Sequence, residues 1–426
     1  MPEWISPAQR VSGAICLPGD KSISHRYAML ASIAEGVTRI HNYSTGADCH
    51  STLGCIRALG IRADEEGSEV TIHGRGLEGL TAPARELDAG NSGSTIRMLS
   101  GILAAQPFTS RLAGDESLSR RPMERIMKPL SAMGGSISAR EGRFPPLEIH
   151  GAKLQAIDYT LPVASAQVKT CVLFAGLYAE GATIVREPVR SRDHTEIALR
   201  EFGADIRRER HAITIQSHPK LTGRELFVPS DLSSAAFFIV AALLVPGSSL
   251  VLRGVGLNPT RSTLLDVLVA MGASIKILKV EEQNGELAGE ILVKSARLRG
   301  GTIEKETTAA LIDEIPVLAV LGAASDEGLV VRDAAELRVK ETDRIATVAE
   351  NLRRMGVPVE ELHDGLRIPG RERLRAATVD SFGDHRIAMA FSIAALVADG
   401  PCEIRGAEAA SVSFPEFFQI LRQVTA

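Results

Sequence analysis

The chain has 426 residues, of which 45% are apolar and 23% charged, and its net charge is −4. Such a length can form two hydrophobic cores. The net charge provides no overall positive field for nucleic acid, and an aromatic content of 4% argues against base stacking. The longest apolar run, residues 235–245, is too short to span a bilayer, and the first residues lack the pattern of a signal peptide. We therefore expect a cytoplasmic protein that binds neither membrane nor nucleic acid.

Six stretches share one layout, which predicts six buried helices. Each begins with small, polar or charged residues, continues through an Ala/Leu/Ile-rich segment, and mostly ends at Gly. The stretches are Asp20–Gly36, Asn91–Ala105, Ala164–Gly181, Asp231–Gly247, Asp313–Gly328 and Asp384–Gly400.

A short β-like run follows each predicted helix, and a second predicted helix follows that run. The β-like runs are 37–41, 108–113, 182–186, 249–253, 329–332 and 402–405. Five of the second helices end in a similar signature around Gly60, Gly134, Gly203, Gly272 and Gly356, which gives a period of roughly 70 residues. Alternating apolar residues then predict a closing strand in most units. Each unit is therefore a βαβαββ repeat, and the sixth is cut short.

Two similar segments, Leu17–Asp20 and Val228–Asp231, each precede a set of three repeats. We interpret them as crossovers between two domains, near 17–21 and 227–231. The first domain is 20–228, and the second is 1–19 plus 229–426. The predicted fold class is α/β (α+β), with six repeats, three per domain, and a cleft between the domains.

Other patterns exclude several kinds of site. The five cysteines are scattered without a C-x-x-C pair, which favours reduced thiols and disfavours zinc. Gly74–Gly79 matches G-x-G-x-x-G, but Pro83 follows and no helix is predicted there, so we expect a loop rather than a dinucleotide site.

The starts of the predicted helices are suited to anions, because unpaired backbone N–H groups and a partial positive charge lie there. Basic residues recur at or near these starts: Lys21, Arg26, Arg97, Arg121, Lys169, Arg192, Lys340, Arg344 and Arg386. Lys340 and Arg344 are expected on one helical face. Asp313 and Glu314 could cap a helix or transfer protons, and His385 could be a core or a site residue. Asp231–Ser234 offers no basic group and is expected to act only as a cap.

Several motifs together resemble the 5-enolpyruvylshikimate-3-phosphate (EPSP) synthase family of enolpyruvyl transferases, in order and over the full length. They are Leu17–Arg26, Ala89–Arg97, Arg121–Met123, Ser165–Lys169, Ser191–Glu196, Leu337–Arg344 and Gly383–Arg386. The resemblance implies a two-domain fold of six βαβαββ repeats. It also implies transfer of the carboxyvinyl group of phosphoenolpyruvate to the 5-hydroxyl of shikimate 3-phosphate, with release of phosphate. This is a step of the shikimate pathway, through chorismate, to the aromatic amino acids.

The resemblance also implies the site residues. Shikimate 3-phosphate would contact Lys21, Ser22, Arg26, Ser165, Ala166, Gln167, Arg192, Asp313 and Lys340. Phosphoenolpyruvate would contact Lys21, Asn91, Gly93, Arg121, Gln167, Arg344, His385 and Arg386. Catalysis is assigned to Asp313 and Glu341 as acid and base, and to Lys21 beside the attacking oxygen and the departing phosphate. No metal or organic cofactor is expected, and the chain is expected to be a monomer.

Some positions depart from the best-known branch of the family. Ala166 stands in place of a Ser, Glu336 in place of an Asn, Val412 in place of a Lys, and Met98 in place of a Pro. These changes resemble a divergent bacterial branch. Glyphosate is expected to inhibit, since Gly93 leaves room for it, although the sequence does not fix the degree of sensitivity.

Two alternatives remain at this stage. The sister enzyme, UDP-N-acetylglucosamine enolpyruvyltransferase, typically carries a reactive Cys in the loop that corresponds to Gly114–Arg121, and this loop has none. A non-catalytic anion-binding protein would not need Lys21, Asp313 and Glu341 together, because binding anions does not require carboxylates.

Overall fold

The computed structural model describes residues 2–425 and groups the chain into two compact units. The inserted unit is Gly19–Val228 together with Glu282–Glu286. The terminal unit consists of the chain up to Pro18, Pro229–Glu281, and Leu287 onward. Each unit has its own apolar core and is described by itself below.

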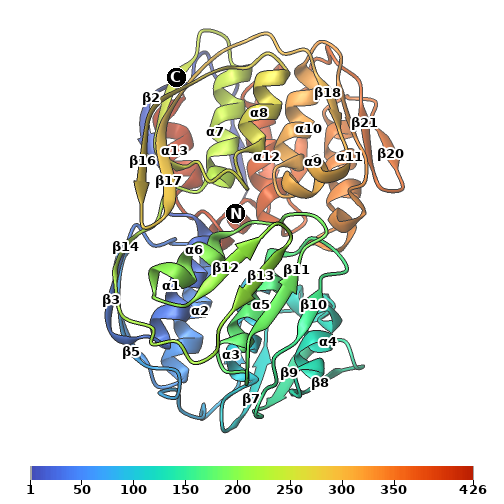
Figure 1. Ribbon diagram of the computed structural model, residues 1–426. Helices are drawn as coiled ribbons and strands as arrows, with labels where there is room; N and C mark the ends of the chain where they lie inside the picture. Colours follow the sequence, from blue (N-terminus) through green and yellow to red (C-terminus); the bar gives the residue numbers. More distant parts are fainter. Residues whose placement is uncertain (1, 426) are drawn as a thin grey trace. The chain divides into compact units, whose positions relative to one another are not determined.

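Three inner helices form the centre of the inserted unit: α1 (Lys21–Ser32), α3 (Gly93–Leu103) and α5 (Ala166–Gly176). They pack against one another, α3 mainly on α5, and are buried along most of their length (Figure 1). Three outer helices, α2 (Ala47–Ala58), α4 (Glu124–Ala132) and α6 (His194–Glu201), follow the strands that leave the inner helices.

Each inner helix of this unit leads into a four-stranded sheet. The first sheet has the order β14 (Glu225–Phe227), β3 (Glu35–His41), β5 (Glu69–Arg75), β4 (Arg62–Glu66). The second is β6 (Leu87–Asp88), β7 (Thr109–Ala113), β9 (Phe144–His150), β8 (Ser136–Arg140). The third is β10 (Asp158–Thr160), β11 (Thr183–Arg186), β13 (Ala212–Ile215), β12 (Ile206–Glu209). In each sheet the first two strands are parallel and the other neighbours antiparallel.

The terminal unit repeats this plan around the inner helices α7 (Leu232–Leu244), α10 (Ile315–Ala324) and α12 (His385–Ala395), which pack side by side (Figure 1). All 11 residues of α12 are buried, which explains why the segment after Arg386 is apolar except for Ser392. The other helices are α8 (Thr263–Ala270), α9 (Lys305–Ala310), α11 (Arg344–Arg354) and α13 (Phe417–Val424).

The first sheet of the terminal unit has the order β2 (Ser12–Cys16), β15 (Ser249–Gly256), β17 (Glu286–Lys294), β16 (Ser274–Gln283). The second has the order β18 (Gly301–Ile303), β19 (Leu329–Val331), β21 (Gly365–Ile368), β20 (Glu360–Leu362). The sixth repeat has β22 (Thr378–Asp380) and β23 (Cys402–Arg405), and β1 (Glu3–Ile5) from the beginning of the chain pairs antiparallel with β23. The shortened sixth repeat is thus completed by a strand that lies about 400 residues earlier.

The glycine signatures after the second helices mark five helix ends of one kind. Gly60, Gly134, Gly203, Gly272 and Gly356 have φ between +86° and +99°. The residue after each donates its N–H to a carbonyl five residues earlier, at 2.8–3.1 Å. This is the Schellman arrangement, in which the left-handed residue favours glycine. The glycines predicted to end the inner helices behave differently: α1 ends at Ser32, and Gly36 already belongs to β3.

The tip of the β16–β17 hairpin groups with the inserted unit, a feature that the sequence analysis did not predict. The Asn284 side chain accepts a hydrogen bond from the Phe227 N–H at 3.0 Å. Glu286 Oε1 lies 2.7 Å from His194 Nδ1, and both side chains are 2% exposed. The chain therefore enters the inserted unit twice, once for 210 residues and once for five.

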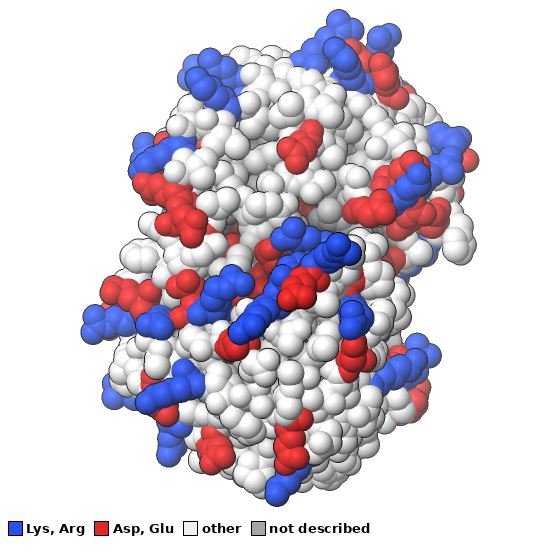
Figure 2. Space-filling model, viewed as in Figure 1, with Lys and Arg blue, Asp and Glu red and all other residues white. Residues whose placement is uncertain are grey.

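The exposed charges are mixed. Figure 2 shows Lys and Arg interspersed with Asp and Glu over the visible face, as the net charge of −4 suggests. All five cysteines are unpaired, as expected. Between residues 2 and 425, no helix is long and apolar enough to cross a membrane, and no group of side chains is arranged to hold a metal ion.

Candidate functional site

The predicted site residues divide between the two units, and each group lies largely at the starts of inner helices. Lys21, Ser22, Arg26, Asn91, Gly93, Arg121, Ser165, Ala166, Gln167 and Arg192 belong to the inserted unit, and Asp313, Lys340, Glu341, Arg344, His385 and Arg386 to the terminal unit.

Polar caps fix the helix starts of the inserted unit. The N–H of Ile23 donates to the Asp20 carboxylate at 2.9 Å, that of Thr95 to Ser92 Oγ at 3.0 Å, and that of Val168 to Ser165 Oγ at 3.4 Å. These contacts identify the N-caps of α1, α3 and α5. The residues next to each cap are those that the sequence analysis assigned to substrates.

Hydrogen bonds join the second and third helix starts. Arg121 Nη2 donates to Asn91 Oδ1 at 2.7 Å, and Arg97 Nη1 donates to Gln167 Oε1 at 2.9 Å. A Cβ placed on Gly93 would lie 2.7 Å from Arg97 Nη1 and 3.5 Å from Arg121 Nη1. Asn91, Gly93, Arg121 and Gln167 are therefore brought together, with Arg97 as the link between them.

Arg26 is a buried cation at the centre of this unit. Its guanidinium donates to the Ser22 carbonyl and Oγ, both at 2.7 Å, to Thr195 Oγ1 at 2.7 Å, and to Thr170 Oγ1 at 3.0 Å. Burial lowers its pKa to about 10, Asp20 opposes that change, and the charge of Arg192 adds to it. Arg26 thus stays protonated at neutral pH.

Lys21 forms an ion pair with Asp48 of α2, with 2.9 Å between Nζ and Oδ2. The Lys21 side chain is 20% exposed and that of Asp48 only 8%. Asp48 had no predicted role, although it lies at the start of a predicted second helix. Beneath this pair, Thr52 Oγ1 is 2.7 Å from both His25 Nδ1 and Thr95 Oγ1, which connects α1, α2 and α3.

Lys169 lies near the start of α5, as expected, but its ammonium group pairs with buried carboxylates. Its side chain is 0% exposed, and Nζ lies 2.9 Å from Glu196 and 3.2 Å from Glu187. The sequence could not show this, because the two carboxylates follow Lys169 by 18 and 27 residues.

In the terminal unit, Asp313 lies beside two cations. Asp313 Oδ1 is 4.0 Å from Lys340 Nζ and 3.7 Å from Arg344 Nη1. Glu336 also approaches Lys340, at 3.5 Å. Lys340 follows a 3-10 helix (Ala335–Val339), whereas Arg344 begins α11, so the prediction of one shared helical face was wrong. Asp313 brings the two cations together instead.

Carboxylates surround Arg344. Asp384 Oδ2 lies 2.8 Å from its Nε, and Glu341 Oε2 lies 2.6 Å from its Nη2. Burial alone would lower the pKa of Arg344, but Asp384, Glu341 and Asp313 outweigh burial and raise the pKa above its usual value. Asp384 also caps α12, because it accepts from the Arg386 N–H at 2.8 Å. His385 is the first residue of α12 and is buried.

At the start of α10, Glu314 was expected as a possible helix cap, and the structure differs. It occupies the N-cap position but makes no capping hydrogen bond through its side chain. Its buried carboxylate instead lies 3.9 Å from Arg386 Nη1 and 3.6 Å from Arg261 Nη2.

The start of α7 also differs in part from its prediction. Asp231 is the expected cap and accepts from the Ser233 N–H at 2.8 Å. A basic group is nevertheless present, because Arg261 from the loop after β15 donates to Ser233 Oγ and lies 3.9 Å from Asp231. No local pattern connects Arg261 with Ser233, which lies 28 residues earlier, so this contact was not predictable.

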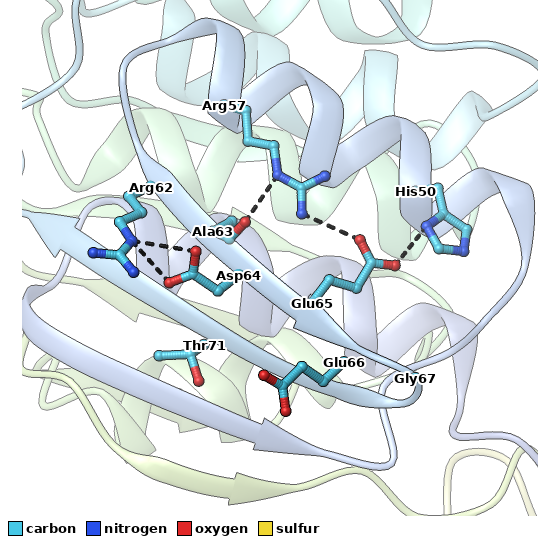
Figure 3. A pocket seen from close by; sticks show the side chains of 9 residues that line it. All are labelled: His50, Arg57, Arg62, Ala63, Asp64, Glu65, Glu66, Gly67 and Thr71. Carbon is cyan, nitrogen blue, oxygen red and sulfur yellow. Dashed lines mark hydrogen bonds and ion pairs between the residues drawn. The ribbon is translucent and has the colours of Figure 1, made fainter.

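A shallow hollow of about 1010 Å³ lies elsewhere on the inserted unit, between α2 and β4 (Figure 3). It contains no predicted site residue. Most of its titratable side chains pair with one another: His50 and Arg57 with Glu65 at 2.7 and 3.1 Å, and Arg62 with Asp64 at 2.8 Å. This surface is therefore not a rival to the helix starts.

The fold is that of the enolpyruvyl transferases. The enolpyruvyl transferase NikO from Streptomyces tendae superposes with a TM-score of 0.79 over 99% of this chain and 96% of its own, and its identity of 20% shows the fold alone. EPSP synthase from Acinetobacter baumannii is 42% identical, with a TM-score of 0.89 over 100% and 98% of the two chains.

Sequence comparison defines the family. The 3-phosphoshikimate 1-carboxyvinyltransferase of Solibacter usitatus is 72% identical over 100% of both chains. Residues 5–421 match the family model for EPSP synthase (3-phosphoshikimate 1-carboxyvinyltransferase). The chain belongs to the EPSP synthase family, which confirms both the predicted fold class and the resemblance.

Proposed function

We propose that this chain transfers the carboxyvinyl group of phosphoenolpyruvate to the 5-hydroxyl of shikimate 3-phosphate and releases phosphate, in the shikimate pathway of aromatic amino-acid biosynthesis. The match of residues 5–421 to the EPSP synthase family carries this conclusion. The cationic helix starts support it, because both substrates carry a phosphate and a carboxylate.

For shikimate 3-phosphate, we assign the acceptor site of the inserted unit to α1, α5 and the loop before α6. The residues are Lys21, Ser22, Arg26, Ser165, Ala166, Gln167 and Arg192, and we add Asp313 and Lys340 from the terminal unit. Arg26 and Arg192 supply two cations from this unit, which suits a phosphate dianion. Ala166 has no hydroxyl, so its contact would use the backbone N–H.

For phosphoenolpyruvate, the assigned groups are Lys21, Asn91, Gly93, Arg121 and Gln167, with Arg344, His385 and Arg386 from the terminal unit. Asn91, Arg121 and Gln167 are already held by hydrogen bonds, so their orientation costs little when a ligand binds. Arg344 is equally constrained by Asp384 and Glu341.

The chemistry requires one proton to be added at the CH₂ carbon of phosphoenolpyruvate, while the 5-hydroxyl loses a proton and its oxygen attacks the adjacent carbon. The tetrahedral intermediate then loses a proton from the new methyl group and expels phosphate. We assign these proton transfers to Asp313 and Glu341, with Lys21 beside the attacking oxygen and the phosphate. Asp313 lies within 4.0 Å of Lys340 and 3.7 Å of Arg344, which keeps a carboxylate next to the cations that would hold the substrates.

The test is phosphate release by the purified chain. Release from phosphoenolpyruvate should require shikimate 3-phosphate, and UDP-N-acetylglucosamine should not replace it. Equal release with both acceptors, or none with either, would refute the proposed function.

We further propose that the chain is a cytoplasmic monomer and that glyphosate inhibits it. The five unpaired cysteines fit a reducing compartment. Light scattering should give a mass near 45.5 kDa, and a dimer mass would contradict the monomer.

A further inference from the structure

The inserted unit contains a cluster of four charged side chains, and none of its members is assigned to a substrate. We call Lys169, Glu187, Glu196 and Arg208 the charge cluster. The exposed fractions of these side chains are 0%, 0%, 5% and 19%. Lys169 and Arg208 each contact both carboxylates, at 2.9 Å for Glu196 and 3.2 Å for Glu187.

Burying four charges is costly, and well-packed apolar side chains would often give the same stability or more. The arrangement is balanced, with two cations and two carboxylates. It also connects three segments: Lys169 belongs to α5, Glu187 follows β11, and Glu196 lies in the first turn of α6. The last two of these segments flank the short loop that carries Arg192.

Glu187 makes contacts that the other members of the cluster do not. Its Oε1 accepts from the Ser191 N–H at 3.2 Å and also from Ser191 Oγ–H. The opposite end of the loop is held by Thr195, whose Oγ1 accepts from Arg26 at 2.7 Å. Arg192 lies between these two anchors, so the carboxylate of Glu187 fixes the backbone directly before it.

We propose that Glu187 is a positioning residue for the acceptor phosphate, because it holds the Ser191–Arg192 backbone so that Arg192 and Arg26 meet the same phosphate. This inference rests on the proposed function, in which Arg192 binds shikimate 3-phosphate. Lys169 and Arg208 also pair with the Glu187 carboxylate, but the bonds to Ser191 come from Glu187.

Glu187→Gln is the main test. The amide keeps the shape of the side chain but is a weaker acceptor than the carboxylate. We expect the KM for shikimate 3-phosphate to rise by roughly tenfold, the factor for one charge-assisted hydrogen bond. We expect kcat, and the KM for phosphoenolpyruvate at saturating shikimate 3-phosphate, to change by less than about threefold.

Two control variants separate positioning from stability. Lys169→Met removes a charge from the same cluster but leaves the bonds between Glu187 and Ser191, so the melting temperature should fall while the KM for shikimate 3-phosphate changes by less than about threefold. Asp158→Asn breaks the exposed ion pair with Arg186, the residue before Glu187. This variant should change neither the melting temperature nor the KM for shikimate 3-phosphate. If Glu187→Gln does not fold, Ser191→Ala replaces it, since this variant removes the hydroxyl contact and keeps all four charges.

The outcomes distinguish the positioning role of Glu187 from the proposed function. An unchanged KM in Glu187→Gln, or an equal rise in Lys169→Met, overturns the positioning role while the wild-type turnover still supports the proposed function. A wild-type chain without turnover and without calorimetric binding of shikimate 3-phosphate overturns both.

Discussion

Asp313 and Glu336 both approach the ammonium group of Lys340, but their surroundings differ. Asp313 also contacts Arg344, and its side chain is 21% exposed, whereas that of Glu336 is 42% exposed. A carboxylate held between two cations is available for proton transfer close to bound anions. A carboxylate at the surface has no such constraint, and its ion pair contributes little.

We therefore expect Asp313→Ala to lower kcat by about 10²- to 10⁴-fold, the usual contribution of a positioned acid or base. Glu336→Gln, which removes the other carboxylate near Lys340, should retain most of the activity. Steady-state kinetics and thermal melting of both variants test this. An active Asp313→Ala variant, or one that loses activity only because it unfolds, would refute the catalytic role.

Gly93 lies at a position where a side chain would contact Arg97. In Gly93→Ala the new Cβ would meet the far end of Arg97 at 2.7 Å, so that flexible side chain would move. Stability should change by no more than about 1 kcal/mol, the usual difference between Gly and Ala in a helix. The KM for phosphoenolpyruvate should rise, because Arg97 orients Gln167.

The matched control is Gly54→Ala in α2, where no atom lies within 4 Å of the added Cβ. It should leave the KM unchanged. Equal kinetics for the two variants would contradict a steric role for Gly93.

His25 should make stability depend on pH. Burial, then the charges of Lys21 and Arg26, lower its pKa in the folded protein below 6.5. Below about pH 6.5 the unfolded chain therefore binds a proton that the folded chain does not, and stability falls by up to about 1.4 kcal/mol per pH unit until the folded pKa is reached. Above this window the contribution is fully present.

His25→Gln should remove this part of the acid sensitivity. Urea unfolding of both proteins at pH 7.5 and 5.5 measures it, and His363→Gln, at an exposed position, is the control. A loss of stability between the two pH values that is the same in wild type and His25→Gln would show that His25 is not responsible.

At the scale of elements, two aspartates cap neighbouring helices in different environments. Asp343 caps α11 by accepting from the Ala346 N–H at 3.0 Å, and its side chain is 36% exposed. Asp384 caps α12 but is fully buried and also pairs with Arg344. Replacing either residue by Ala removes a cap, but only the second leaves a buried guanidinium without its main partner.

Asp343→Ala should cost about 1 kcal/mol of stability, the value of an N-cap. Asp384→Ala should cost about 3–5 kcal/mol, as for breaking a buried ion pair. Urea unfolding gives both values. Similar losses in the two variants would mean that the pair with Arg344 adds little.

The elements themselves were largely predictable, because each relies on short-range signals. The cap residues and the apolar segments located the inner helices, and Gly60 and its equivalents located the ends of the second helices. Partners far apart in sequence were not predictable. Lys169 is satisfied by Glu187 and Glu196, and neither the spacing nor the residue type shows it.

For the whole molecule, the repeats suggested six similar sheets, and the structure contains them. The strands that complete three of these sheets come from elsewhere: β14 pairs with β3, β2 with β15, and β1 with β23. Each of these pairs joins strands that lie far apart in the sequence. The period of the repeats does not show which distant strands pair. The roles of the site residues likewise stay predictions, since the structure shows which side chains meet but not what they bind.

The hairpin tip at Glu282–Glu286 has a consequence for dissecting this protein. Cutting the chain at residue 228 would separate His194 from Glu286 and Phe227 from Asn284. The buried imidazole would then lose its carboxylate partner. A fragment of residues 19–228 would therefore be an incomplete folding unit. A short loop carrying Gln283–Glu286, grafted after Val228, should restore the contacts of Glu286 with His194 and of Asn284 with Phe227.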